Sequence, residues 1–156
     1  MPLSPGDKAP DFDLPTADGQ VSLQGLKGKT VVLYFYPKDD TSGCTAEAQG
    51  FTAAAGDFAK AGATVVGVSK DSAASHGKFQ AKYGLDLTLG SAKDDDMVER
   101  YGAWIEKSMY GRKYMGIDRS TYLIDKDGVI RRVWRKVKVP GHVAEVLAEA
   151  KSLAEG

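Results

Sequence analysis

Two uninterrupted apolar runs stand out along the chain, TVVLYFY at residues 30–36 and ATVVGVS at residues 63–69. Continuous runs of β-branched and aromatic residues are typical of strands buried on both faces of a parallel sheet. The residues between the runs follow a helical period instead, with apolar positions at Ala48, Phe51, Ala55 and Phe58. The pattern therefore predicts a strand, a helix that begins near Thr45 and ends by Gly62, and a second strand.

The remainder of the chain divides into shorter elements. In chain order the patterns predict a hairpin from PDFDLP and QVSL at 10–23, a helix from Asp71 or Ser72 to Gly84, a strand at 85–90, a small helix at 94–101, a hairpin from 120–125 and 129–134, and a last helix at 142–154. The segment at 103–118 contains Gly111 and Gly116, and we expect it to be a loop that borders the functional site.

The order of these elements indicates the fold class. Strands that alternate with helices imply a partly parallel sheet flanked by helices, and the late hairpin adds an antiparallel pair. The chain shows no internal repeat, low-complexity tract or linker. We therefore expect residues 1–156 to form a single α/β domain.

Charge and composition remove several classes of partner. Lysine and arginine number 21, as do aspartate and glutamate, so the net charge gives no reason to expect nucleic acid or an anionic membrane. No secretory signal or membrane-spanning segment is visible, and a lone cysteine fits a reducing compartment, so we expect a cytoplasmic protein. The basic run RRVWRKVK at 131–138 is best explained by charges that point outward from an edge strand, with a partner-docking patch as the minor alternative.

The lone cysteine, Cys44, is the first candidate for chemistry. Most free cysteines are inert, buried hydrophobes. Cys44, however, lies a short loop beyond the end of the strand at 30–36, where open α/β sheets bind ligands, and at the predicted start of a helix. A helix N-terminus or a neighbouring cation favours the thiolate, which is the nucleophilic form. A reactive cysteine is therefore the favoured interpretation.

The surroundings of Cys44 carry a resemblance to a known family. The spacing Pro37-x-x-x-Thr41-x-x-Cys44 is similar to the active-site loop of the peroxiredoxins. The chain also resembles the peroxiredoxin Q group, also called bacterioferritin comigratory proteins, in three features. These are the segment YPKDDTSGCTAEA, the predicted N-terminal hairpin and the segment GIDRSTYLID. This resemblance covers nearly the whole chain. It implies a thioredoxin-like fold with an N-terminal β-hairpin extension.

The resemblance also implies an activity and a set of site residues. The Cys44 thiolate would attack hydrogen peroxide or an organic hydroperoxide and become a sulfenic acid, without metal or other cofactor. Thr41 would bind the peroxide, Arg119 would stabilise the thiolate and the leaving oxygen, and Pro37 would close one wall of the pocket. Each residue also has a plainer interpretation: Thr41 as a turn or cap, Pro37 as a strand terminator and Arg119 as a surface charge. Glu47 would orient Arg119 or complement the helix dipole.

The chain departs from the group at one position that matters. Many members carry a second, resolving cysteine five residues after the first, where this chain has Gln49, and others carry it in the following helix, where none is present here. We therefore expect a one-cysteine cycle in which an external thiol, such as thioredoxin or glutathione with glutaredoxin, reduces the sulfenic acid. Replacement of a native cysteine at Gln49 is the alternative that one sequence leaves open.

Other candidate sites are weaker. His76 and His142 show no ligand-like spacing, and the run Asp94-Asp95-Asp96 lacks the alternation of a calcium loop, so we expect no metal. The favoured prediction is a monomeric thiol peroxidase. A redox sensor or holdase that uses oxidation of Cys44 as a signal is the main alternative. A thioredoxin-like thiol transferase is disfavoured because the chain has no Cys-x-x-Cys pair.

Overall fold

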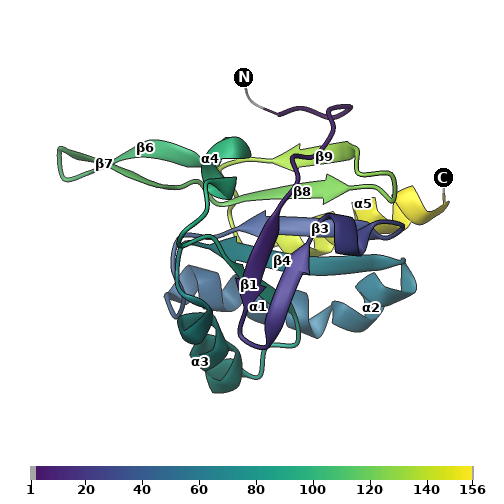
Figure 1. The fold of residues 1–156 in the computed structure, drawn as a ribbon, viewed down its shortest axis with the longest axis horizontal. Coiled ribbons are helices and arrows are strands. Elements are labelled where there is room, and N and C mark those ends of the chain that lie inside the picture. The colour runs from purple at the N-terminus through teal and green to yellow at the C-terminus, as the bar shows by residue number, and fades with distance from the viewer. Residues whose placement is uncertain (1–2, 156) are drawn as a thin grey trace.

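A computed structural model describes residues 3–155 of the chain. Its centre is a five-stranded mixed sheet in the order β5-β4-β3-β8-β9 (Figure 1). The strands span Thr88–Ser91 (β5), Ala63–Ser69 (β4), Thr30–Phe35 (β3), Ser120–Ile124 (β8) and Ile130–Trp134 (β9). The first three run parallel to one another, whereas β8 lies antiparallel to both β3 and β9. The predicted apolar runs thus form the two central parallel strands.

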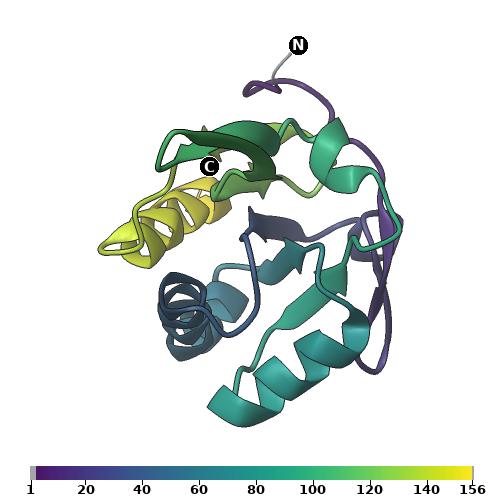
Figure 2. The same cartoon turned by 90° about the vertical axis from the view of Figure 1, so that its left-hand side faces the viewer.

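The helices are α1 (Ser42–Ala53), α2 (Ala55–Lys60), α3 (Ala73–Tyr83), α4 (Met97–Arg100) and α5 (His142–Glu155). Side chains of α1, α2 and α5 pack on one face of the sheet. There they contact Tyr34 of β3 and Tyr36, which directly follows β3. The other face is covered by α4 and by an N-terminal hairpin of β1 (Asp13–Thr16) and β2 (Gly19–Ser22). With the sheet seen nearly edge-on, α1 and α5 lie on one side and this hairpin on the other (Figure 2). No helix among residues 3–155 has the length and apolar character that crossing a bilayer requires.

Several predicted boundaries were wrong. The strand expected at 85–90 spans Thr88–Ser91, and the small helix expected at 94–101 spans Met97–Arg100. The helix after β3 begins at Ser42 rather than near Thr45, because Thr41 already has the extended backbone of an N-cap residue. The same helical pattern is also divided into α1 and α2 at Ala54. Ala54 is neither glycine nor proline, so the apolar period of the sequence gives no sign of a break between α1 and α2.

The expected loop at 103–118 was also wrong, because most of it forms a second hairpin. Strands β6 (Trp104–Met109) and β7 (Arg112–Ile117) pair in regular antiparallel register and project from one end of the molecule (Figure 1). Most side chains of this hairpin are exposed or half-buried, so its strands lack the alternation of buried and exposed positions that identifies a strand in a sequence.

Candidate active site

Cys44 lies in the first turn of α1, just beyond the carboxyl end of β3. Strand β3 is buried on both faces, and the chain leaves the sheet at Pro37 and enters α1 after Thr41. The Cys44 side chain is only 1% exposed and packs in the cluster between the sheet and α1. The sequence prediction of a thiol at a helix start is therefore confirmed.

Arg119 reaches the sulfur of Cys44 from the other half of the sheet. It immediately precedes β8, and the antiparallel register places Phe35, the last residue of β3, opposite Ser120. This pairing brings together two side chains that are 75 residues apart in the sequence, with Arg119 Nη2 3.2 Å from Cys44 Sγ. A thiolate at Cys44 would therefore lie against a fixed cation.

Glu47 holds the other arm of the guanidinium. Arg119 Nη1 donates to Glu47 Oε1 at 2.7 Å, and the Glu47 side chain is completely buried one turn after Cys44. Burial raises the pKa of Glu47 to about 7, although the charge of Arg119 opposes the rise. Burial alone would lower the pKa of Arg119, but the neighbouring Glu47 and Cys44 raise that pKa above its ordinary value. The guanidinium therefore stays charged and oriented between a carboxyl group and the sulfur.

Gly43 leaves room for this arrangement. A Cβ atom at position 43 would lie 3.2 Å from Arg119 Nη2, which is closer than most Cβ contacts in proteins. The absence of a side chain at Gly43 thus lets the guanidinium approach the start of α1 and the sulfur together.

Thr41 and Pro37 frame the loop without touching Cys44 through a hydrogen bond. The Thr41 hydroxyl donates to the carbonyl oxygen of Lys38 at 2.9 Å, and Thr41 is exposed at the helix start. Pro37 is exposed directly after the buried Tyr36. The structure therefore brings Arg119, Glu47 and Cys44 into one hydrogen-bonded group, with Thr41 and Pro37 at its edge.

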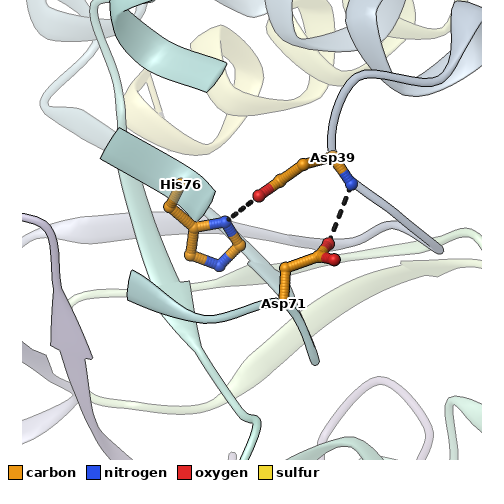
Figure 3. A group of neighbouring side chains, drawn as sticks. All are labelled: Asp39, Asp71 and His76. Atoms are coloured by element: carbon orange, nitrogen blue, oxygen red, sulfur yellow. Dashed lines mark hydrogen bonds and ion pairs between the residues drawn. The ribbon is translucent and has the colours of Figure 1, made fainter. Parts of the chain in front are cut away.

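A buried network that the sequence did not predict lies under this loop. His76 Nδ1 lies 2.7 Å from Asp39 Oδ2, and the backbone N–H of Asp39 donates to Asp71 Oδ2 at 2.8 Å (Figure 3). The Tyr36 hydroxyl donates to the other carboxylate oxygen of Asp39 at 2.5 Å. Although burial opposes it, hydrogen bonds from His76 and Tyr36 keep the pKa of Asp39 below its ordinary value. No short-range motif could have revealed the network, since Asp71 and His76 are 32 and 37 residues from Asp39 in the sequence.

The same network is the group that comes nearest to a metal site among the described residues. One potential ligand atom from each of Asp39, Asp71 and His76 lies within 4.8 Å of the others. These atoms, however, are already engaged with one another, with the Asp39 N–H and with the hydroxyl of Ser69. The arrangement therefore fixes the loop before α1 onto β4 and α3.

Tyr34 is a second feature of the site that the sequence did not predict. Its hydroxyl and Glu47 Oε2 are the two buried side-chain oxygen atoms without a hydrogen-bond partner in the part of the chain that the structure describes. Burial, reinforced by the charges of Glu47 and Cys44, raises the pKa of Tyr34 well above its usual range. The tyrosine thus adds a neutral O–H group to the core beside the site.

Comparisons with known proteins agree with this geometry. Residues 5–133 match the model of the AhpC/TSA family. A putative peroxiredoxin bcp of Coxiella burnetii is 55% identical over 148 residues, which is 94% of this chain and 98% of the relative. Peroxiredoxin Bcp of Bacillus subtilis is 46% identical over 156 residues and covers 99% of both chains.

Solved structures are similar as well. A structure of the Xanthomonas campestris bacterioferritin comigratory protein, described for its alkyl peroxide reduction activity, has a TM-score of 0.87, with 43% identity and 92% of each chain covered. PrxQ of Xylella fastidiosa has a TM-score of 0.92 at 37% identity over 99% of each chain. The predicted thioredoxin-like fold with an N-terminal hairpin is therefore confirmed.

Proposed function

The chain belongs to the AhpC/TSA family, among the peroxiredoxins of the Bcp or peroxiredoxin Q group, and we propose that it is a thiol-dependent peroxidase whose reacting atom is Cys44 Sγ. Its substrates are hydrogen peroxide and organic hydroperoxides. The observation that carries the proposal is the contact of 3.2 Å between Arg119 Nη2 and Cys44 Sγ, in a site where Glu47 fixes the guanidinium.

The oxidation step follows from this geometry. The Cys44 thiolate attacks one oxygen of the peroxide; an S–O bond forms, the O–O bond breaks, and the other oxygen leaves as an alkoxide or hydroxide that takes up a proton. Negative charge moves from sulfur to the leaving oxygen during this step. A charged donor that is already oriented beside the sulfur stabilises such a transition state without reorganisation, which is the usual basis of electrostatic catalysis.

Thr41 and Pro37 have supporting roles in the proposal. The Thr41 hydroxyl donates to the carbonyl of Lys38, and in the proposal its side chain would rotate to donate to a bound peroxide instead. Pro37 would limit the access of water at the edge of the loop. The exposed position of both residues at the mouth of the loop supports these roles.

The reduction of Cys44 requires thiols from outside the chain. Cys44 is the only cysteine, and Gln49 stands exposed on α1 where a resolving thiol would lie in many relatives. A first thiol attacks the sulfenic acid to give a mixed disulfide and water, and a second thiol releases the Cys44 thiol with formation of a disulfide. Because Cys44 is only 1% exposed, the first turn of α1 must open before an external sulfur can reach it.

Four further expectations belong to this proposal. We place the protein in the cytoplasm, since its single thiol suits a reducing compartment. We also infer that residues 1–156 form one domain and that the protein acts as a monomer. Thioredoxin, or glutathione with glutaredoxin, would serve as the reductant.

The proposal is tested by single-turnover kinetics of the reduced protein with hydrogen peroxide. Fluorescence of Trp104 and Trp134 in stopped flow gives the rate, and intact mass gives the product, which we expect to carry one added oxygen. Cys44→Ser should abolish the adduct. A rate no greater than that of a free thiol would overturn the proposal, whereas fast oxidation with slow reduction by every thiol tried would favour a redox sensor.

A further inference from the structure

The β6–β7 hairpin carries an unusual concentration of exposed apolar side chains. Within residues 3–155, the exposed large hydrophobic residues are Met109 (57%), Tyr110 (98%), Tyr114 (43%) and Met115 (49%). All four lie on this hairpin, although it makes up less than a tenth of the chain. Single exposed apolar residues are ordinary on protein surfaces, but a concentration on one projecting element indicates an interaction site.

The strand register separates this hairpin into two chemically different faces. Opposite pairs share a face, so Lys107 lies beside Tyr114 and Met109 beside Arg112. The other face bears Met115 with Glu106 and Lys113, whose side chains form an ion pair at 3.7 Å. No carboxylate among the described residues pairs with Lys107 or Arg112. The first face is therefore basic and apolar, whereas the charges of the second face balance.

The tip of the hairpin is strained in a way that the fold does not explain. Tyr110 and Gly111 both have positive φ, at 52° and 78°, as a two-residue hairpin turn of type I′ requires. Asparagine, aspartate or glycine normally occupies the first of these positions, and a bulky aromatic residue there is an outlier. Because Tyr110 is 98% exposed, no packing within the chain offsets the strain. Backbone strain that the fold does not require is characteristic of functional sites.

The hairpin lies at the catalytic end of the molecule. Its second strand ends at Ile117, two residues before Arg119, and its base is fixed by the hydrogen bond of 2.7 Å from Asp118 N to Ala103 O. In Figure 1 it projects from the end of the sheet toward which β3 runs, and in Figure 2 this end faces the viewer. A protein that binds the hairpin therefore lies at the carboxyl end of β3, the same end of the molecule as Cys44.

We propose that the face formed by Lys107, Met109, Arg112 and Tyr114, together with Tyr110 at the tip, docks the acidic surface of a dithiol protein that reduces oxidised Cys44. This docking surface rests on the proposed function, which requires an external thiol. Its composition supports a protein partner, since tyrosine, methionine and arginine are enriched in the centres of protein interfaces, whereas a small thiol needs no such surface. The unpaired cations select a partner of negative charge.

The chemistry served by docking is a two-step exchange. One thiol of the partner attacks the Cys44 sulfenic acid, an S–S bond forms, and the hydroxyl leaves as water with the thiol proton. The second thiol of the partner then attacks the partner's own sulfur in the mixed disulfide. Cys44 is released as a thiol, and the partner leaves oxidised to an intramolecular disulfide.

The decisive variant is Tyr110→Asn. It creates the Asn-Gly pair that a type I′ turn prefers, so it should leave the hairpin as stable as before or more stable while it removes the aromatic anchor. The oxidised protein is reduced either by an acidic bacterial thioredoxin, kept reduced by its reductase, or by dithiothreitol. We expect reduction by thioredoxin to slow at least about fivefold, as for an interface residue of high energetic weight, with no change in the rates with dithiothreitol or hydrogen peroxide.

Two matched pairs of variants separate the docking surface from general effects. Met109→Ser should slow the reaction with thioredoxin, whereas Met115→Ser on the opposite face should not. Reversal of charge at Lys107 and Arg112 to glutamate should slow that reaction further and weaken its dependence on salt. The same reversal at Lys60 and Lys151, both exposed and on α2 and α5, should have little effect.

Several outcomes would overturn the inference while leaving the peroxidase intact. One is a Tyr110→Asn variant whose reduction slows equally with thioredoxin and with dithiothreitol. Another is an unchanged rate of reduction by thioredoxin in that variant. The third is a wild-type protein that dithiothreitol reduces and thioredoxin does not. A wild-type dimer in sedimentation that Tyr110→Asn converts to a monomer would instead assign the surface to a second copy of this chain. Loss of peroxide reactivity in the wild type would refute the proposed function itself.

Discussion

The imidazole of His76, on α3, meets the carboxylate of Asp39 at 2.7 Å beneath the loop that leads into α1. The other ring nitrogen of His76 lies 3.2 Å from the carbonyl oxygen of Gly90, on β5. The histidine therefore joins the loop that precedes Cys44 to helix α3 and to β5, an edge strand of the sheet.

We expect His76→Leu to destabilise the protein strongly. The substitution leaves the Asp39 carboxylate, which is 7% exposed, without its imidazole partner. Loss of a buried hydrogen bond to a charged group costs about 1.5–3 kcal/mol of the free energy of unfolding. Urea unfolding of the reduced protein measures this loss, and a double-mutant cycle with Asp39→Ala gives the coupling between the two side chains. A coupling near zero would show that the contact does not act as a pair.

Arg119→Lys should slow the oxidation of Cys44 by about 10²–10³-fold, the range found when one donor of an oxyanion site is removed. Lysine keeps the charge, but it lacks the planar fork that contacts Glu47 and Cys44 at the same time. Stopped-flow oxidation by hydrogen peroxide checks this expectation. Arg131→Lys, at an exposed position on β9, is the matched control and should react at the rate of the wild type.

Glu47 should make the stability of the folded protein depend on pH. Its pKa of about 7 in the folded state exceeds the ordinary glutamate value of 4.5, so the folded state binds more protons between these values. The free energy of unfolding therefore falls as pH rises from about 4.5 through about 7 and then levels off, by about 2–4 kcal/mol in total.

Urea titrations at several pH values measure this effect as the difference between the wild type and Glu47→Gln. The glutamine side chain does not titrate, so its curve should lack the decline. A difference that stays constant across this range, or grows in the opposite direction, would contradict the assignment to Glu47.

Gly43→Ala should slow the reaction with peroxide without unfolding the helix. The new methyl group would lie 3.2 Å from Arg119 Nη2 and displace the guanidinium from the sulfur. Alanine is the better helix former by about 1 kcal/mol, and Gly43 is half-buried in the first turn of α1, so the fold should tolerate the change. Gly56→Ala on α2, where a Cβ meets no atom within 4 Å, is the control that should gain stability at an unchanged rate. Equal rates in the two variants would remove the steric argument.

The sequence was sufficient for the parts of the fold whose residues are buried. The two apolar runs at 30–36 and 63–69 became the central strands β3 and β4, because burial on both faces leaves a continuous apolar signal. The motif around Cys44 and the choice of Arg119 came from the resemblance to the peroxiredoxins, and the structure brings these two side chains together.

The remaining features lacked a local signal. The β6–β7 hairpin was missed because its strands bury little and because tyrosine occupies a turn position that asparagine usually marks. The pairing of Asp39 with His76 depends on how α3 is placed against β5 and the loop after β3, which no spacing in the sequence encodes. Roles for Thr41 and Pro37 remain predictions, since both residues stand at the edge of the hydrogen-bonded group.

The antiparallel pairing of Phe35 with Ser120 has a consequence for the time at which the protein becomes reactive. Cys44 precedes β8 in the chain and Arg119 immediately precedes β8, so a nascent chain that ends before residue 119 holds Cys44 without its cation. In such a chain Cys44 should react with peroxide only as fast as a free thiol. Rapid oxidation by peroxide should therefore begin when β8 pairs with β3, and the oxidation rate reports when this long-range pairing has formed.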